Sequence, residues 1–281
     1  MKNFEIYWNQ KLGEGGEGAV YKGRLNGHSV AVKVPHDHER VGRMPHLRVA
    51  ARRGLEIEYR RRNSIRGEHH VKMLGHGLDH NIPFLVFEFA EMGSFADEIE
   101  SMKRRGQVYD PLVALARVEE ILCSLREAHA CNIIHRDVKP SNFLKFADGR
   151  IKLNDFGLGR TADRACSKQT KFFRGTPVYA APEQLNGHCV TKQADIYAVG
   201  VILYEMLFGA RPDATTRSPK IPYRTHLRAE FKTFLQGLLE RNPNDRYCCA
   251  PRCLRELQLV RNAYKVAARP CRRCGRHHQL N

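Results

Sequence analysis

Long hydrophobic runs are missing from this chain of 281 residues. The longest, residues 196–204, ends at Glu205 and is far shorter than the about 20 residues that span a bilayer. The first ten residues also lack the apolar stretch of a secretory signal. We therefore expect a soluble, cytoplasmic protein that makes no use of a membrane.

Acidic residues are scarce relative to basic ones. The chain has 30 Asp and Glu against 47 Lys and Arg, which gives a formal net charge of +17. Such a surplus favours acidic partners, for example phosphate ligands, nucleic acid or acidic proteins. The nine cysteines are an odd, scattered set and make a poor disulfide framework, so we expect a reducing compartment.

The order of the expected elements predicts an α+β protein with two lobes. Charged residues at 27% and hydrophobic residues at 42% are typical of a globular chain. Strands are expected first, around one arginine-rich helix at 47–65, at residues 5–12, 19–25, 29–34, 71–74 and 84–89. Helices are expected afterwards, at residues 95–105, 110–129, 195–208 and 231–240. The boundary falls near residues 91–94.

A glycine-rich turn lies between the first two expected strands. Gly13, Gly15 and Gly18 form G-x-G-x-x-G, which is a weak signal alone because a dinucleotide fold or a plain hairpin also supplies it. The dinucleotide fold requires a helix next and an acidic residue about 20 positions later. Here a strand follows, and Lys33 in V-A-V-K occupies that distance. Glycines let backbone N–H groups approach phosphate, and Lys33 adds an ammonium.

Further motifs in a fixed order resemble the protein kinase family. They are H-R-D-V-K-P-S-N at 135–142, D-F-G at 155–157, G-T-P-V-Y-A-A-P-E at 175–183, D-I-Y-A-V-G at 195–200 and N-P-N-D-R at 242–246. The resemblance implies a bilobal kinase domain at residues 4–257, with a small β-sheet lobe at about 4–90 and a larger helical lobe at about 91–257. Residues 258–281 would form a basic tail that contains cysteine and histidine.

The resemblance implies a catalytic set for phosphoryl transfer from ATP. Asp137 would accept or orient the proton of the substrate hydroxyl, and Lys139 would neutralise the γ-phosphate. Asn142 and Asp155 would hold Mg²⁺, for which Mn²⁺ is an alternative. Lys33 would need an acidic partner on the following helix, where Glu58 is the first choice and Glu56 the second.

The resemblance also implies where ATP binds. Phe87 would be the gatekeeper behind adenine, and the backbone at Glu88 and Ala90 would hydrogen-bond the base. The remaining expected contacts, from the glycine turn and from the walls of the adenine pocket, are Leu12, Gly13, Gly15, Gly16, Gly18, Val20, Ala31 and Leu144.

Substrate type and regulation follow from the same resemblance. Lys139 and the Gly-Thr-Pro step at 175–177 are similar to the serine/threonine branch, and autophosphorylation is expected at Thr170 or, second, Ser167. Glu183 and Arg246 would form a buried, structural ion pair, and Asp195 would brace the catalytic loop. A pseudokinase-like binding module and a kinase-fold enzyme for small molecules remain the alternatives.

Two basic segments fall outside this set. The arginine-rich stretch 40–66 is either a solvated face or a binding surface for acidic protein or nucleic acid. In the tail, Cys271 and Cys274 have C-x-x-C spacing with His277 and His278 close behind. This spacing leaves two alternatives, a zinc site completed by Cys248, Cys249 and Cys253, or a frayed basic end.

Overall fold

The computed structural model describes residues 3–15, 18–36, 38–154, 160–161, 176–213, 221–222 and 227–267. The chain divides into two compact units. The first comprises Met1–Phe95 together with Ser141–Gly159, and the second comprises Ala96–Pro140 with Arg160–Asn281. Segment 141–159 thus groups with the first unit, although its place in the sequence assigns it to the larger lobe.

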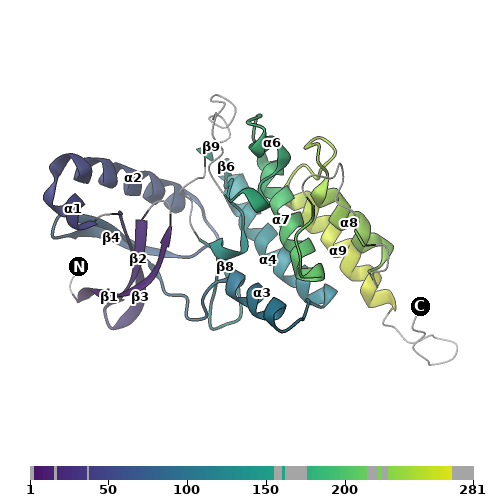
Figure 1. Ribbon diagram of the computed structural model, residues 1–281, viewed down its shortest axis with the longest axis horizontal. Helices are drawn as coiled ribbons and strands as arrows, with labels where there is room; N and C mark the ends of the chain where they lie inside the picture. Colours follow the sequence, from purple (N-terminus) through teal and green to yellow (C-terminus); the bar gives the residue numbers. More distant parts are fainter. Residues whose placement is uncertain are drawn as a thin grey trace. The chain divides into compact units, whose positions relative to one another are not determined.

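The first unit is built on an antiparallel sheet of five strands in the order β1-β2-β3-β5-β4 (Figure 1). The strands are β1 (Phe4–Gly15), β2 (Gly18–Leu25), β3 (His28–Val34), β4 (Met73–Asp79) and β5 (Ile82–Glu88). Side chains alternate across the sheet, so Val30, Val32 and Val34 of β3 enter one apolar cluster with Tyr21 and Phe84. Ala31 and Lys33 therefore face the opposite side of β3.

Helix α2 (Pro45–Ser64) follows the short helix α1 (His38–Arg43) and packs against β5. Its Leu55 enters a second apolar cluster with Val71, Leu85 and Phe87. The same unit contains the two-stranded sheet of β7 (Phe143–Lys145) and β8 (Ile151–Leu153). Isolated bridges join His70 to Leu153 and Ser94 to Leu144. The chain around residues 143–153 is thus fixed to the β-sheet unit by backbone pairing.

The second unit is mainly helical. Its central helix α4 (Pro111–Ala130) begins as the sequence predicts, because the Asp110 carboxylate accepts the backbone N–H groups of Leu112 and Val113 and proline occupies the first turn. Helix α4 packs against α7 and α9, and α8 packs against both α7 and α9 (Figure 1). The other elements, in chain order, are α3 (Phe95–Arg104), β6 (Ile133–Ile134), η1 (Pro140–Asn142), β9 (Arg160–Thr161), η2 (Pro177–Tyr179), α6 (Pro182–Leu185), α7 (Lys192–Phe208), α8 (Ala229–Leu239) and α9 (Ala250–Ala267).

Three sequence expectations need correction. Strand β4 begins at Met73 instead of residue 71 and extends to Asp79, because it pairs with β5 as far as Ile82. Helix α9 was not expected, and it crosses the predicted tail boundary at 257/258 to end at Ala267. Of the described cysteines, five are free thiols but Cys189 is disulfide-bonded. A single disulfide needs only two side chains that the fold brings together, whatever the total count.

None of the helices in the described ranges is both long and apolar enough to cross a membrane.

Candidate active site

The glycine-rich turn shows two kinds of glycine. A Cβ on Gly18, whose φ is +155°, would lie 2.1 Å from the carbonyl oxygen of Val34 at the end of β3, so only glycine fits there. A Cβ on Gly13 or Gly15 would meet nothing within 4 Å among the described residues. Gly18 therefore closes the turn against β3, whereas Gly13 and Gly15 have room for a side chain among the described residues. Gly16 lies outside the described residues.

Lys33 is paired with Glu58. The Lys33 ammonium lies 2.9 Å and 2.8 Å from the two carboxylate oxygens of Glu58, and both side chains are buried. Lys33 comes from β3 and Glu58 from the inner face of α2. Glu56, the second choice, instead forms an exposed ion pair with Arg60, one turn along the helix.

The expected adenine contacts divide into a packed group and an outer group. Ala31, Ala90 and Leu144 pack against the cluster that contains Phe87. Ala31 is paired with Phe87 across β3 and β5. Val20 is half-buried opposite Lys33, and Leu12 is exposed. The first unit thus brings three of the four expected apolar contacts beside the predicted gatekeeper or Lys33.

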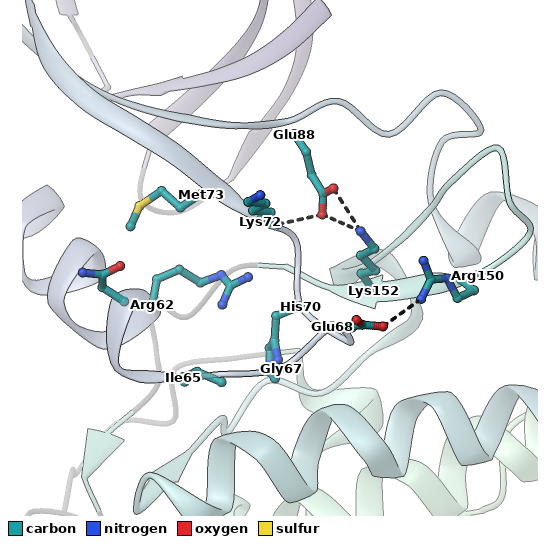
Figure 2. Close-up of a pocket in the computed structure, with 11 residues that line it drawn as sticks. Arg62, Ile65, Gly67, Glu68, His70, Lys72, Met73, Glu88, Arg150 and Lys152 are labelled. Atoms are coloured by element: carbon teal, nitrogen blue, oxygen red, sulfur yellow. Dashed lines mark hydrogen bonds and ion pairs between the residues drawn. The ribbon is translucent and has the colours of Figure 1, made fainter.

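Glu88 ends strand β5 and faces a cavity of about 370 Å³ (Figure 2). Its carboxylate accepts the backbone N–H of Lys72 at 2.7 Å and the ammonium of Lys152 at 2.7 and 2.9 Å. These bonds fix the end of β5 to β8. The cavity is separate from the expected nucleotide site. Among the residues expected to contact ATP, only Glu88 lines this cavity. Its lining is Arg62, Asn63, Ile65, Gly67, Glu68, His70, Lys72, Met73, Glu88, Arg150 and Lys152.

In the second unit, Asp137, Lys139 and Thr176 form a compact polar group. One Asp137 oxygen accepts the backbone N–H of Thr176 at 3.0 Å, and the other lies 2.7 Å from the Lys139 ammonium. Lys139 also donates to the Thr176 hydroxyl at 2.8 Å. These contacts hold the Asp137 carboxylate in one orientation, with its charge matched by one ammonium.

Asp195 holds the backbone just before Asp137 through hydrogen bonds. The Asp195 carboxylate accepts the N–H groups of His135 at 2.9 Å and Arg136 at 2.8 Å, and lies 2.8 Å from His129 Nε2. Burial alone would raise the pKa of Asp195, but the bonds from His129 and Arg136 hold it below its ordinary value. Arg136 has φ of +69°, an uncommon conformation that these bonds stabilise.

Arg246 and Glu183 form the buried ion pair that the resemblance implies. Both terminal nitrogens of Arg246 donate to the Glu183 carboxylate, at 2.8 and 3.2 Å. The guanidinium also donates to the carbonyls of Glu240, Gln193 and Arg241. This pair ties α6 to the start of α7 and to the segment after α8.

The sequence analysis did not predict a second polar network, which is centred on Glu205 and contacts Tyr179. The Tyr179 hydroxyl donates to the buried carboxylate of Glu205 at 2.6 Å, and Lys103 donates to the other oxygen of the same carboxylate at 2.5 Å. Burial and the bond to Glu205 raise the pKa of Tyr179 above its ordinary value. Arg211 lies 3.2 Å from Glu205. The sequence shows only that Tyr179 and Glu205 have mainly apolar neighbours, and this does not predict that they bond to each other.

Asn142 and Asp155 are the expected metal ligands. Asn142 is buried at the end of η1, and its carbonyl accepts the N–H of Asn154, the residue before Asp155. Asp155 itself lies outside the described residues, as do Thr170 and Ser167. An amide and a carboxylate oxygen are a donor set that suits Mg²⁺.

The zinc site receives no support. Among the residues that the structure describes, no three His, Cys, Asp or Glu side chains gather as metal ligands would. Cys253 is buried in the core of the helical unit, where burial raises its pKa, so it serves packing. Cys271, Cys274, His277 and His278 lie outside the described residues.

The arginine-rich helix presents several cations to solvent. Arg52, Arg53 and Arg60 are exposed on α2, whereas Arg62 is buried and donates to the carbonyl of Val71. One of these arginines thus has a structural role in joining α2 to the following segment. Binding of acidic protein or nucleic acid to the exposed ones stays a prediction.

The comparisons with known proteins agree with this geometry. A family model described as "Protein kinase domain" matches residues 7–256. An Aurora kinase of Schizosaccharomyces pombe is 31% identical over 255 residues, which cover 86% of this chain and 68% of that protein. The serine/threonine-protein kinase PknL of Mycobacterium tuberculosis is 32% identical over 256 residues, or 85% of this chain and 61% of that protein.

A third relative shows how much of these proteins lies outside the match. The probable serine/threonine-protein kinase pknA2 of Bifidobacterium longum is 34% identical over 206 residues, which cover 72% of this chain but 26% of that protein. The matched part therefore spans from about a quarter to about two thirds of these three relatives. The family model covers nearly the whole chain, and the polar groups described above lie in the sequence motifs typical of this family. The chain therefore belongs to the protein kinase family.

Proposed function

We propose that the protein transfers the γ-phosphoryl group of ATP to serine and threonine hydroxyls of proteins, including its own. The observation that carries this proposal is the group of Asp137, Lys139 and Thr176. Its carboxylate has one oxygen on a backbone N–H and one on an ammonium. A carboxylate held in this way can orient a hydroxyl for attack and receive its proton.

The other residues have roles that fit phosphoryl transfer, which needs positioning and charge neutralisation more than covalent help. Lys33, aimed by Glu58, would bind the ATP phosphates together with the backbone of the glycine-rich turn. The side chains that would contact adenine are Leu12, Val20, Ala31 and Leu144, and the backbone at Glu88 and Ala90 would hydrogen-bond the base. Asn142 and Asp155 would hold Mg²⁺, or Mn²⁺ in its place, which supplies positive charge to the phosphate oxygens when bound. Because ATP is an intracellular substrate, we propose that the protein acts in the cytoplasm.

The preference for serine and threonine is supported by two features. Lys139 stands two residues after Asp137 and bonds Thr176, the pattern that resembles the serine/threonine branch. The relatives named above carry serine/threonine-protein kinase in their names in two of three cases. A protein substrate is supported by the intact segment 175–183, which in the family faces a peptide.

The experiment is phosphate incorporation from γ-labelled ATP with Mg²⁺ into the protein itself, a generic basic protein and a mixture of small-molecule hydroxyl compounds. We expect label on serine and threonine, located by mass spectrometry, and include Thr170 and Ser167 among the sites to be read. Label confined to small molecules would favour a kinase-fold metabolite enzyme. Nucleotide binding without any transfer would favour a pseudokinase-like module.

A further inference from the structure

A histidine just after β3 contacts the glycine-rich turn. His36 lies two residues beyond the end of β3 and three beyond Lys33. Its Nε2 is 2.5 Å from the carbonyl oxygen of Gly15, and its Nδ1 is 3.2 Å from a carboxylate oxygen of Glu14. Since β2 separates β1 from β3 in the sheet, His36 joins two parts of the chain that are not neighbouring strands.

Both ring nitrogens of His36 therefore face oxygen acceptors. A neutral imidazole carries one N–H, so it can donate to the carbonyl or to the carboxylate but not to both. In the neutral ring the second nitrogen would present a lone pair to an oxygen, which is repulsive. Only the imidazolium donates at both positions, and it also attracts the negative charge of Glu14. The hydrogen bond to Gly15 and the ion-pair distance to Glu14 therefore suit an imidazolium.

The charged groups around His36 agree with this reading. Glu14 is also hydrogen-bonded by Lys11 on the same strand, and that bond, followed by the charges of Lys11 and His36, lowers the pKa of Glu14. Glu14 thus stays a carboxylate under all conditions in which histidine titrates. Glu14 and Lys11 are the charged groups that contact this point within the described ranges, since Glu17 and Asp37 lie outside them.

We propose that His36, as an imidazolium, is a positioning residue that clamps the glycine-rich turn through Gly15 and Glu14. This inference rests on the proposed function, because it assigns the clamp to ATP binding. The clamp fixes the end of β1 beside the glycine-rich turn and connects it to the strand that carries Lys33. A turn that is already held in place loses less conformational entropy when ATP binds, so ATP binds more tightly.

The contact is partly exposed, which sets the size of the effect. The side chains of His36 and Glu14 are 42% and 50% exposed, so solvent and salt screen their attraction. We expect His36→Gln to raise the KM for ATP by about three- to tenfold, in the range of one hydrogen bond, with kcat changed less than twofold. The matched control is His28→Gln, because His28 is exposed at the opposite end of β3.

A measurement without catalysis separates this proposal from the proposed function. In the full chain labelled with ¹⁵N-histidine, the ring nitrogen signals absent from His36→Gln report the state of His36. Two protonated nitrogens near neutral pH support the clamp, and one protonated nitrogen overturns it, whether or not the protein transfers phosphate. Absence of transfer in the wild type would reject the proposed function, whereas an active wild type with an unaffected His36→Gln would reject the clamp alone.

Discussion

Two ion pairs in the helical unit have nearly the same length and different surroundings. The Lys139–Asp137 distance is 2.7 Å and the Arg246–Glu183 distance is 2.8 Å. Arg246 and Glu183 are 0% and 5% exposed, and Arg246 donates to three carbonyls besides the carboxylate. Lys139 and Asp137 are 23% and 13% exposed. Distance does not distinguish these two pairs, but their solvent access does.

The physical reason is the cost of burial. A buried charge is tolerated only when its partner and further hydrogen bonds replace water, as they do around Arg246. Asp137 keeps partial access to solvent, which its proposed role toward a substrate hydroxyl requires. We therefore propose that the Arg246–Glu183 pair serves folding and that the Asp137–Lys139 pair serves the chemistry, and the following variants test that division.

The largest effect on stability should come from Arg246→Leu. This change leaves the buried Glu183 carboxylate without its cation, and we expect the free energy of unfolding to fall by about 3–5 kcal/mol. Urea unfolding measures it. In the double variant Glu183→Met with Arg246→Leu, part of the loss should return because no buried charge remains unpaired. A double variant as unstable as the sum of both single changes would argue that the ion pair itself is unimportant.

Asp195→Asn should have the next largest effect. The two carboxylate oxygens of Asp195 accept from His129, His135 and Arg136, whereas an asparagine amide has one acceptor oxygen and no charge. We therefore expect the free energy of unfolding to fall by about 2–3 kcal/mol. Because the folded pKa of Asp195 lies below the ordinary value of 3.8, its contribution is complete above about pH 4 and is lost as pH falls further. Urea unfolding between pH 3 and pH 7 should show this acid loss in the wild type and a smaller one in the variant.

Thr176→Val should have the smallest effect. It removes the hydroxyl that accepts from Lys139 but keeps the backbone N–H that donates to Asp137. We expect phosphate incorporation to fall by about three- to tenfold, with the free energy of unfolding changed by less than about 1 kcal/mol. Thr176→Ser keeps the hydroxyl and should retain most activity. Equal loss in both variants would show that the hydroxyl bond does not matter.

Much of the fold was predictable because the local signals agree with the final packing. The sequence predicts a helix at 110–129, and α4 runs over Pro111–Ala130 with the expected cap. The alternation of V-A-V-K-V correctly places Lys33 and Ala31 on one face of β3. These features depend on residues close together in the chain, where period and capping are informative.

The failures involve tertiary contacts. Strand β4 contains Gly75 and Gly77, which weaken any local strand signal, and its true extent is set by pairing with β5. The sequence offers Cys253 as one ligand of a zinc site, whereas in α9 Cys253, Leu257 and Val260 form the buried side of a helix. The Glu205 network was missed for the same reason, because Tyr179, Lys103 and Glu205 come together only in the folded chain.

The candidate site divides in the same way. Motif order predicts Asp137, Asn142 and Lys33 as site residues, but the choice between Glu56 and Glu58 depends on which face of α2 is inward. Only the folded chain shows that Glu58 reaches Lys33 while Glu56 contacts Arg60 on the outside. The orientation of Asp137 likewise depends on Thr176, 39 residues further along the chain.

The most direct measurement compares Asp137→Asn with Arg246→Leu in two readouts from the same preparations, phosphate incorporation from labelled ATP and urea unfolding. Asparagine keeps the acceptor for the Thr176 N–H, so we expect Asp137→Asn to lose about 10²–10⁴-fold in incorporation while its free energy of unfolding stays within about 1 kcal/mol of the wild type. Arg246→Leu should instead lose stability first. An Asp137→Asn variant that is fully active, or that loses activity only because it unfolds, would contradict the assignment of chemistry to the partly exposed pair.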